Sequence, residues 1–159
     1  MSKALSGVRV IDMTHNQAGP ACTQMLAWLG AEVIKLESPN GGDVARQIMR
    51  DKDGDGLFFL VLNANKQSLT LNLKTDEGKA LFKKLMSESD VLVENFSPGA
   101  LDRLGLGYDD LKVLNPGLIY LQLKGFLSGP YEERRALDEI VQMMSGLAYM
   151  TGPPGQPLR

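Results

Sequence analysis

The chain has 159 residues, of which 43% are hydrophobic and 23% charged, and its formal net charge is −2 at pH 7. This length suffices for one globular domain with a buried core, and the composition is ordinary for such a domain. The near-neutral charge excludes a protein that recruits nucleic acid or an anionic membrane through its overall field. No apolar run reaches the roughly 18 residues that a membrane-spanning helix needs.

Two features predict a cytoplasmic location. Residues 1–7 lack the apolar stretch of a secretory signal. Cys22 is the single cysteine, so the chain cannot form an internal disulfide, which is typical of a reducing compartment.

Residues 8–37 carry the most informative pattern of the sequence. An apolar strand at 8–12 enters a polar loop, Pro20 opens a helix, Gly30 closes it, and a second buried strand follows at 32–37. The loop holds His15, the single histidine, beside the amides of Asn16 and Gln17. In open α/β sheets such a loop lies at the carboxyl edge of the strand, where ligands bind.

The rest of the chain continues the alternation of strands and helices. Thr75 predicts a helix cap, and Asp138 predicts the cap of a last helix that runs through Ala148. Such repeats favour a Rossmann-like α/β fold, an open and mainly parallel sheet with helices on both faces. The further segments are a turn at 38–42, a polar segment at 43–56, an apolar segment of undecided type at 57–63, a strand at 68–73, a helix with apolar Ala80, Leu81, Leu85 and Met86, a strand at 91–93, a strand-to-helix loop at 94–99, a helix that ends by 115–116, a strand at 118–123, and turn-forming residues at 151–159.

Standard short motifs do not account for the function. Residues 51–56 resemble the first half of a calcium-binding loop, but the twelfth position holds Leu62 instead of the required glutamate. The sequence contains no G-x-G-x-x-G, no P-loop and no G-x-S-x-G. One histidine and one cysteine cannot form a usual zinc site, so no metal is expected.

Several long blocks, in the same order, resemble class III (family III) CoA-transferases of the CaiB/BaiF type. The resemblance covers residues 5–159, and the nearest branch is that of formyl-CoA:oxalate CoA-transferases. The blocks that carry it are residues 14–26, 30–35, 63–68, 71–75, 93–99 and 118–125.

The resemblance implies covalent catalysis in which an aspartate attacks an acyl-CoA and forms a mixed anhydride, then an aspartyl-CoA thioester. It places that aspartate just beyond Arg159. Residues 1–159 are therefore expected to be the amino-terminal part of a CoA-binding Rossmann-like large domain that is truncated before its end and inactive alone. The implied reactants are an acyl-CoA and a small carboxylate, with no metal or redox cofactor and no nucleic acid or membrane. The implied assembly is an interlocked homodimer, and a complementary carboxyl-terminal chain is an alternative partner.

The resemblance also assigns roles to particular residues. Gln17 and Glu139 are expected close to the reacting carboxylate as supporting catalytic residues. The expected CoA contacts are His15, Gln17, Ala18, Leu71, Lys74, Asn95, Phe96 and Arg103.

Departures from the family pattern limit the choice of substrate. Ser38 replaces an arginine that can stack on adenine, and Ala136 and Asp138 replace a lysine and a tyrosine. Pro153 follows Gly152, where oxalate-specific enzymes have Phe-Trp, which argues against oxalate. Leu137 stands where α-methylacyl-CoA racemases use a histidine, which disfavours racemisation.

Two other functions remain open from the sequence. One is a free-standing module that binds acyl-CoA without catalysis. The other is a dinucleotide-dependent oxidoreductase domain, which only the alternation of strands and helices favours.

Overall fold

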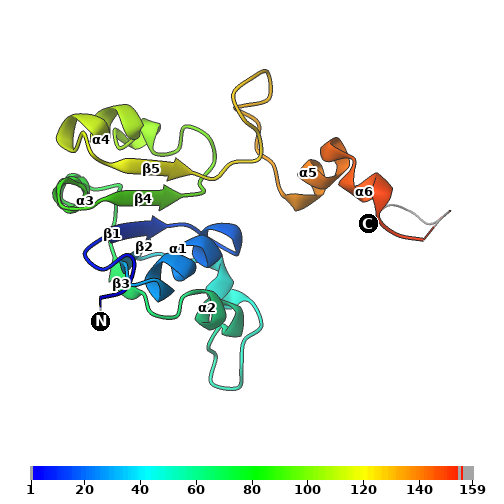
Figure 1. Ribbon diagram of the computed structural model, residues 1–159, viewed down its shortest axis with the longest axis horizontal. Coiled ribbons are helices and arrows are strands. Elements are labelled where there is room, and N and C mark those ends of the chain that lie inside the picture. The colour runs from blue at the N-terminus through cyan, green and yellow to red at the C-terminus, as the bar shows by residue number, and fades with distance from the viewer. Residues whose placement is uncertain (1, 154, 156–159) are drawn as a thin grey trace. The chain divides into compact units, whose positions relative to one another are not determined.

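A five-stranded sheet in the order β3-β2-β1-β4-β5 organises the first 123 residues, and each neighbouring pair of strands is parallel (Figure 1). This computed structural model describes residues 2–153 and 155. The predicted α/β class with an open, parallel sheet is confirmed. The strands are β1 (Arg9–Met13), β2 (Glu32–Glu37), β3 (Gln67–Thr70), β4 (Val91–Glu94) and β5 (Ile119–Gln122).

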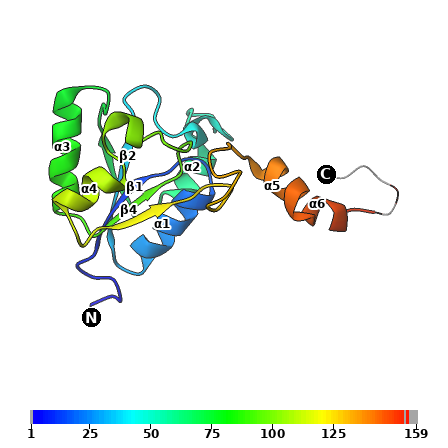
Figure 2. The ribbon, with the colours of Figure 1, turned by 90° about the horizontal axis from the view of Figure 1, so that it is seen from above.

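Helices cover both faces of this sheet. Figure 2 shows α3 and α4 on one side of the strands and α1 on the other. The helices of this part are α1 (Ala18–Trp28), α2 (Leu57–Leu62), α3 (Asp76–Ser87) and α4 (Tyr108–Leu114), with short 3-10 helices η1 (Val44–Gln47) and η2 (Asp102–Leu104).

The two faces of the sheet build two separate apolar clusters. Side chains alternate between faces along a strand, so Val10 and its neighbour Ile11 point in opposite directions. Val10 packs in the cluster that contains Ala27 of α1, whereas Ile11 packs in the cluster that contains Phe82 of α3. Both strand residues are 0% exposed. Burial on both faces explains why the central strands β1 and β4 read as mostly apolar runs in the sequence.

The ends of α1 follow local sequence signals. Pro20 is the third residue of the helix, where a missing backbone N–H breaks no hydrogen bond within the helix. Gly30 lies just after the helix with φ of 107°, the left-handed conformation that favours glycine. Gly19 is required for another reason, because a Cβ there would lie 2.3 Å from the Cβ of Thr14.

Three elements differ in detail from the sequence prediction. The undecided apolar segment forms α2. The strand predicted at 68–73 is shorter in the structure, where β3 spans Gln67–Thr70. Thr75 caps α3 as predicted, because its hydroxyl oxygen accepts the backbone N–H of Gly78. Within the helix, however, the predicted apolar residue Leu81 is 58% exposed, whereas its neighbour Phe82 is fully buried. Helical spacing alone does not decide which of two adjacent apolar residues meets the sheet.

A second compact unit spans Lys124–Arg159 and contains α5 (Asp138–Ser145) and α6 (Leu147–Met150). The prediction of one helix capped by Asp138 is wrong. Leu137 occupies the cap position, and Gly146, with φ of 80°, separates the two helices. Glycine readily adopts this left-handed conformation, which ends a helix. Of the predicted turn at 151–159, residues 154 and 156–159 lie outside the described residues, and the assignment of residues 1–159 to one domain stays a prediction.

Candidate functional site

The carboxyl ends of β1 and β4 form the point at which the strand order reverses. The loop after β1 leads into α1 on one face of the sheet, and the loop after β4 leads towards α4 on the other (Figure 2). Open α/β sheets bind ligands in the crevice between two such diverging loops. The topology therefore makes residues 14–17 and 95–98 the candidate ligand-binding loops.

A reciprocal pair of hydrogen bonds joins these two loops. The backbone N–H of His15 donates to Oδ1 of Asn95 at 2.8 Å, and Nδ2 of Asn95 donates to the carbonyl oxygen of His15 at 2.9 Å. The imidazole lies against Phe96, with ring centroids 5.3 Å apart. Three of the predicted CoA contacts thus meet directly, although His15 is 80 residues from Asn95 in the chain.

Asp12 anchors the base of the first loop. It is 0% exposed, and its Oδ1 accepts hydrogen bonds from the backbone N–H and hydroxyl of Thr14. Its Oδ2 lies 2.8 Å from Nζ of Lys66 and 3.8 Å from Nζ of Lys35. Burial alone would raise the pKa of Asp12, but the two ammonium groups outweigh it and hold this pKa below its ordinary value.

Asp43, in the loop after β2, ties that loop to the first one. Its Oδ1 accepts the backbone N–H of Asn16 at 3.0 Å and that of Ala45 at 2.9 Å, and its Oδ2 lies 3.0 Å from Nζ of Lys35. Asn16 has φ of 63°, a left-handed conformation that asparagine tolerates. Burial acts to raise the pKa of Asp43, but these N–H donors and Lys35 keep it below its ordinary value.

The last residue of β2 adds a second ion pair beside this loop. Glu37 is buried and accepts the backbone N–H of Asp43 at 2.8 Å. Its carboxylate also takes two hydrogen bonds from the guanidinium of Arg46, at 2.9 and 2.6 Å. The Arg46 guanidinium lies 3.7 Å from the centroid of the Phe59 ring, so it is fixed on two sides.

The carboxyl end of β4 lacks an equivalent cation among its described contacts. Glu94 is 1% exposed, and its side chain accepts the backbone N–H of Phe96 at 2.7 Å and the hydroxyl of Tyr120 at 3.3 Å. Burial therefore raises the pKa of Glu94 above its ordinary value. Burial and the adjacent Glu94 also raise the pKa of Tyr120.

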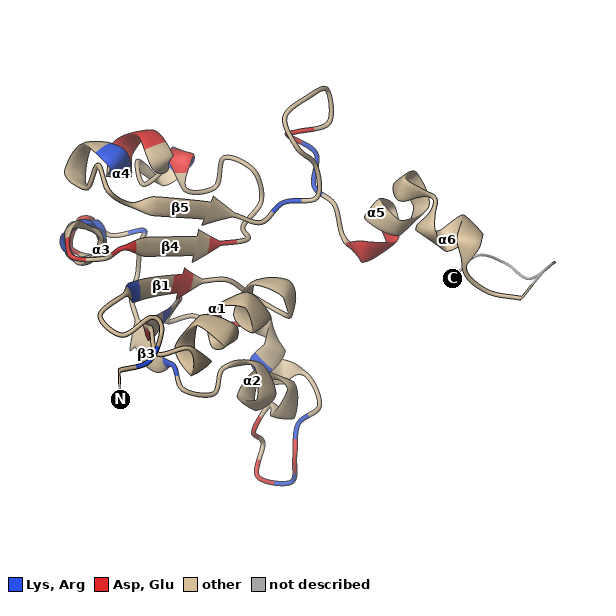
Figure 3. Ribbon diagram, in the orientation of Figure 1, with Lys and Arg blue, Asp and Glu red and all other residues tan. Residues whose placement is uncertain are grey.

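The other predicted CoA contacts lie at the same edge of the sheet but are not joined to His15 in the structure. Gln17 is the exposed cap residue of α1, without a side-chain bond to the helix, and Ala18 is its first residue. Leu71 packs against the core after β3, and Lys74 is exposed. Arg103 lies exposed on η2 and donates a 3.3 Å hydrogen bond to the carbonyl oxygen of Pro98. Figure 3 shows that charge is absent along α1.

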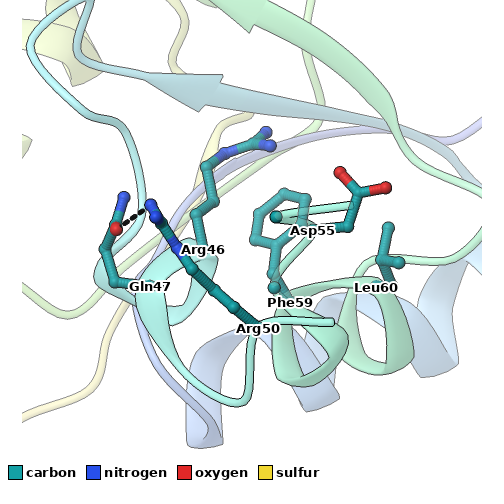
Figure 4. A pocket seen from close by; sticks show the side chains of 8 residues that line it. Arg46, Gln47, Arg50, Asp55, Phe59 and Leu60 are labelled. Atoms are coloured by element: carbon teal, nitrogen blue, oxygen red, sulfur yellow. Dashed lines mark hydrogen bonds between the residues drawn. The ribbon is translucent and has the colours of Figure 1, made fainter. Parts of the chain in front are cut away.

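Two shallow depressions flank the β2 side of this edge. The larger, about 240 Å³, lies between η1 and α2 and is lined by Arg46, Arg50 and Phe59 among others (Figure 4). The smaller, about 210 Å³, is bordered by Ser38, Arg46 and Thr70. Neither depression includes His15 or Gln17.

The remaining predictions lie elsewhere. Glu139 is exposed on the first turn of α5, within the second unit, and its catalytic role stays a prediction. Among the described residues, no group of three or more His, Cys, Asp or Glu side chains could hold a metal ion. Asp51 accepts the backbone N–H groups of Asp53 and Asp55, each at 2.9 Å, so its side chain closes a turn. No described helix is long and apolar enough to cross a membrane.

Sequence reasoning missed the buried charges beneath the loops: Asp12, Lys35, Asp43 and Lys66. A signal was present, because Asp12 and Lys35 interrupt apolar strands, and a charge in a buried strand requires a partner. The sequence does not say which residue that partner is.

Comparisons with known proteins give one consistent result over nearly the whole chain. CoA-transferase family III matches residues 5–159. Two proteins described as formyl-CoA:oxalate CoA-transferase are similar to it: one from Streptomyces avermitilis is 51% identical over 160 residues, and one from Streptomyces coelicolor is 50% identical over 159. Each alignment covers 99% of this chain, but only 39% and 38% of the respective relative. The chain therefore spans well under half the length of these relatives.

Solved structures give the same result. A CAIB/BAIF family protein from Brucella suis is 38% identical with a TM-score of 0.91, over 100% of this chain and 43% of that one. A protein from Mycobacterium tuberculosis is 40% identical with a TM-score of 0.89, over 99% of this chain and 43% of that one.

Proposed function

Because this chain belongs to CoA-transferase family III, we propose that it supplies the CoA-binding part of an enzyme that moves CoA between an acyl-CoA and a small carboxylic acid. The observation that carries the proposal is the reciprocal pairing of Asn95 with His15 across the switch point. It joins two loops at the edge of the sheet where this fold class binds ligands.

The proposed reaction proceeds through an aspartate outside these 159 residues. Its carboxylate attacks the thioester carbonyl and releases CoA thiolate, leaving a mixed anhydride. The thiolate then attacks the aspartyl carbonyl and releases the donor acid, leaving an aspartyl-CoA thioester. The acceptor carboxylate attacks that thioester, the thiolate leaves again, and its return to the acceptor carbonyl gives the new acyl-CoA and regenerates the aspartate.

The part played by this chain is binding and orientation. The pantetheine arm lies along His15, Gln17 and Ala18, where exposed amide and backbone groups at the start of α1 can hydrogen-bond to it. The amide of Gln17 can donate to an oxygen that gains negative charge during acyl transfer.

Lys74 and Arg103 stand at two separate strand ends and suit the phosphates of CoA. Lysine offers a point charge there, and arginine offers a planar fork. Asn95 and Phe96 contact the nucleotide portion of CoA in this proposal, and Leu71 packs nearby. Glu139 acts close to the reacting carboxylate in the same proposal.

The whole enzyme is proposed to be a homodimer with interlocked chains. Large apolar side chains of the second unit are exposed, which suits a surface that further polypeptide covers. Those on α5 and α6 are Ile140, Val141, Met143, Met144, Leu147, Tyr149 and Met150.

Titration of the 15N-labelled chain with CoA tests the binding site. We expect amide shifts concentrated at residues 15–18 and 95–96, with smaller shifts at Lys74 and Arg103. NADH is the matched control ligand, because it shares the adenine nucleotide but lacks the pantetheine arm. Stronger binding of NADH than of CoA would overturn the proposal in favour of a dinucleotide-dependent domain.

A transferase assay separates catalysis from binding. The chain alone is expected to bind CoA without turnover. A longer polypeptide that adds the corresponding remainder of a family III enzyme is expected to transfer CoA. Turnover by the 159 residues alone would show that the nucleophile lies within them. CoA binding without turnover in the longer polypeptide would identify an acyl-CoA-binding module.

A further inference from the structure

We propose that Asp43 is a positioning residue for the acyl-CoA site: it orients His15 so that Nδ1 carries the proton and Nε2 accepts a hydrogen bond from an N–H or O–H group of the ligand. The identity of that ligand rests on the function proposed above. The proposed protonation of Nδ1 rests on the contacts of Asp43 and His15 and does not depend on which ligand binds.

Asp43 itself is held in one position. Its side chain is 0% exposed, and its two oxygens accept from the backbone N–H groups of Asn16 and Ala45 and from Nζ of Lys35. Its own backbone N–H donates to Glu37. A carboxylate with this many fixed donors has little freedom to turn, so its field at the neighbouring loop has a constant direction.

The imidazole of His15 faces this carboxylate with a single nitrogen. Nδ1 lies 3.7 Å from Oδ1 of Asp43, which is too long for a hydrogen bond but close enough for a strong interaction between a charge and an N–H dipole. Phe96 lies against the ring, with the centroids 5.3 Å apart. The His15 side chain remains 26% exposed, so a ligand can reach it.

The surroundings keep this imidazole uncharged near neutral pH. Burial lowers the pKa of His15; Lys35 acts in the same direction, and the carboxylates of Asp43, Glu37 and Asp12 oppose them without reversing the result. A neutral imidazole carries one N–H and one lone pair. A carboxylate beside Nδ1 attracts the N–H and repels the lone pair, which selects the Nδ1–H tautomer.

The selected tautomer has a chemical consequence for binding. Free histidine favours the Nε2–H form, which would present a donor to the ligand. With the proton on Nδ1, Nε2 becomes an acceptor. The pantetheine arm has two amide N–H groups and a hydroxyl, so an acceptor at this loop complements it, while the backbone N–H groups at the start of α1 complement its carbonyl oxygens.

Nitrogen NMR of the imidazole tests this directly, because His15 is the single histidine of the chain. The 15N shifts of the two ring nitrogens report which one carries the proton. We expect mainly Nδ1–H in the unsubstituted chain and mainly Nε2–H in Asp43→Asn, whose side chain keeps an acceptor for Asn16 but loses the charge. Asp53→Asn, in an exposed turn, is the matched control and should leave the tautomer unchanged.

Each outcome decides between positioning and a merely structural role. If the unsubstituted chain carries mainly Nε2–H, the proposal is overturned without any variant. The proposal is also overturned if Asp43→Asn folds and shows the same tautomer as the unsubstituted chain. CoA should move the Nε2 resonance of the unsubstituted chain and bind about tenfold more weakly to Asp43→Asn, the factor carried by one hydrogen bond. A tautomer switch with no response of Nε2 to CoA overturns the proposed ligand and leaves the coupling of Asp43 to His15 standing.

Discussion

Two buried carboxylates at the same edge of the sheet differ in their electrostatic environment. Asp12 lies next to the last residue of β1 and has two lysines within 4 Å, whereas Glu94 ends β4 and accepts hydrogen bonds from a backbone N–H and a tyrosine hydroxyl. The strands are adjacent, with Met13 paired to Glu94. Nevertheless, the pKa of Asp12 is lowered and that of Glu94 is raised. Neighbouring cations, rather than depth of burial, decide the direction of the shift.

The carboxyl ends of β1 and β4 therefore hold their loops by different interactions. The charged cluster of Asp12, Lys35, Asp43 and Lys66 holds the loop of His15 from beneath through hydrogen bonds and ion pairs. The Glu94 end holds the N–H of Phe96 with a carboxyl group whose charge is disfavoured. The first end therefore depends on ion pairs, whereas the second depends on hydrogen bonds to a buried carboxyl group.

Replacing Asp12 by alanine should have the largest effect on stability. It leaves Lys35 and Lys66 buried without their shared counter-charge, and breaking a buried pair on one side costs about 3–5 kcal/mol of unfolding free energy. Urea denaturation measures the change. The control is Asp53→Ala in the exposed turn, which should change stability by less than about 0.5 kcal/mol. Similar losses in the two variants would show that the buried cluster has no special role.

Asn95→Ala should have the next largest effect. It removes both hydrogen bonds to the backbone of His15 and leaves one N–H and one C=O to find water, which costs about 1–3 kcal/mol. CoA affinity, measured by calorimetry, should fall by more than the lower stability alone would cause, because the two loops are no longer joined. Asn95→Asp keeps the acceptor for the His15 N–H and should retain part of the affinity. Equal CoA affinity in Asn95→Ala and the unsubstituted chain would show that the switch point is not part of the CoA site.

Glu94→Gln should produce a smaller effect that depends on pH. The folded-state pKa of Glu94 lies above its unfolded value, so ionisation as the pH rises through the folded pKa costs stability, and this cost is absent below the unfolded pKa. Glutamine keeps an oxygen for the Phe96 N–H and does not ionise. The variant should therefore gain stability relative to the unsubstituted chain as pH rises from 4 to 8 in urea denaturation.

The same measurement on Asp12→Asn should give the opposite trend. The folded-state pKa of Asp12 lies below its unfolded value, so its contribution is complete above the unfolded pKa and disappears as pH falls through the folded pKa. The deficit of Asp12→Asn should be largest near neutral pH and shrink on acidification. Parallel pH trends for the two variants would contradict the contrast between the two ends.

Arg103→Ala and Lys74→Ala should have the smallest effects on stability, within about 0.5 kcal/mol, because both side chains are exposed. Their effect should fall on CoA affinity, with a loss that diminishes at high salt because the contacts are ionic. Calorimetry at low and high ionic strength checks this. Lys79→Ala, on α3, is the matched control, and an equal loss of affinity in that variant would mean that the effect is one of general charge.

Much of the fold followed from local sequence signals. Val10 and Ile11 stand in an apolar run bounded by a polar loop, Gly30 has the position of a helix stop, and Thr75 precedes two acidic residues at a helix start. These features depend on near neighbours in the chain. The split between α5 and α6 was missed, although Gly146 was visible, because a glycine inside a helical pattern can be tolerated or can end the helix.

The candidate site was predictable only in part. Resemblance to a family brought together His15, Asn95 and Phe96 as expected contacts, but it did not indicate that two hydrogen bonds join the loops of the first two. Asp43 gave no signal of its own, since an aspartate in a polar segment is ordinarily a solvated charge. Its partners at Asn16 and Lys35 belong to other elements.

The sequence by itself determined the alternation of strands and helices, the polar loop at the end of β1, and the family to which the chain belongs. The tertiary structure decided which charges meet and in which direction the pKa values of the buried carboxyl groups shift. The physical reason is range: helix caps and strand periodicity arise within a few residues, whereas Coulomb interactions and desolvation depend on what lies within a few ångströms in space. Asp12 and Lys66 are 54 residues apart in the chain, and they are in contact only because β1 and the loop before β3 lie together in the folded sheet.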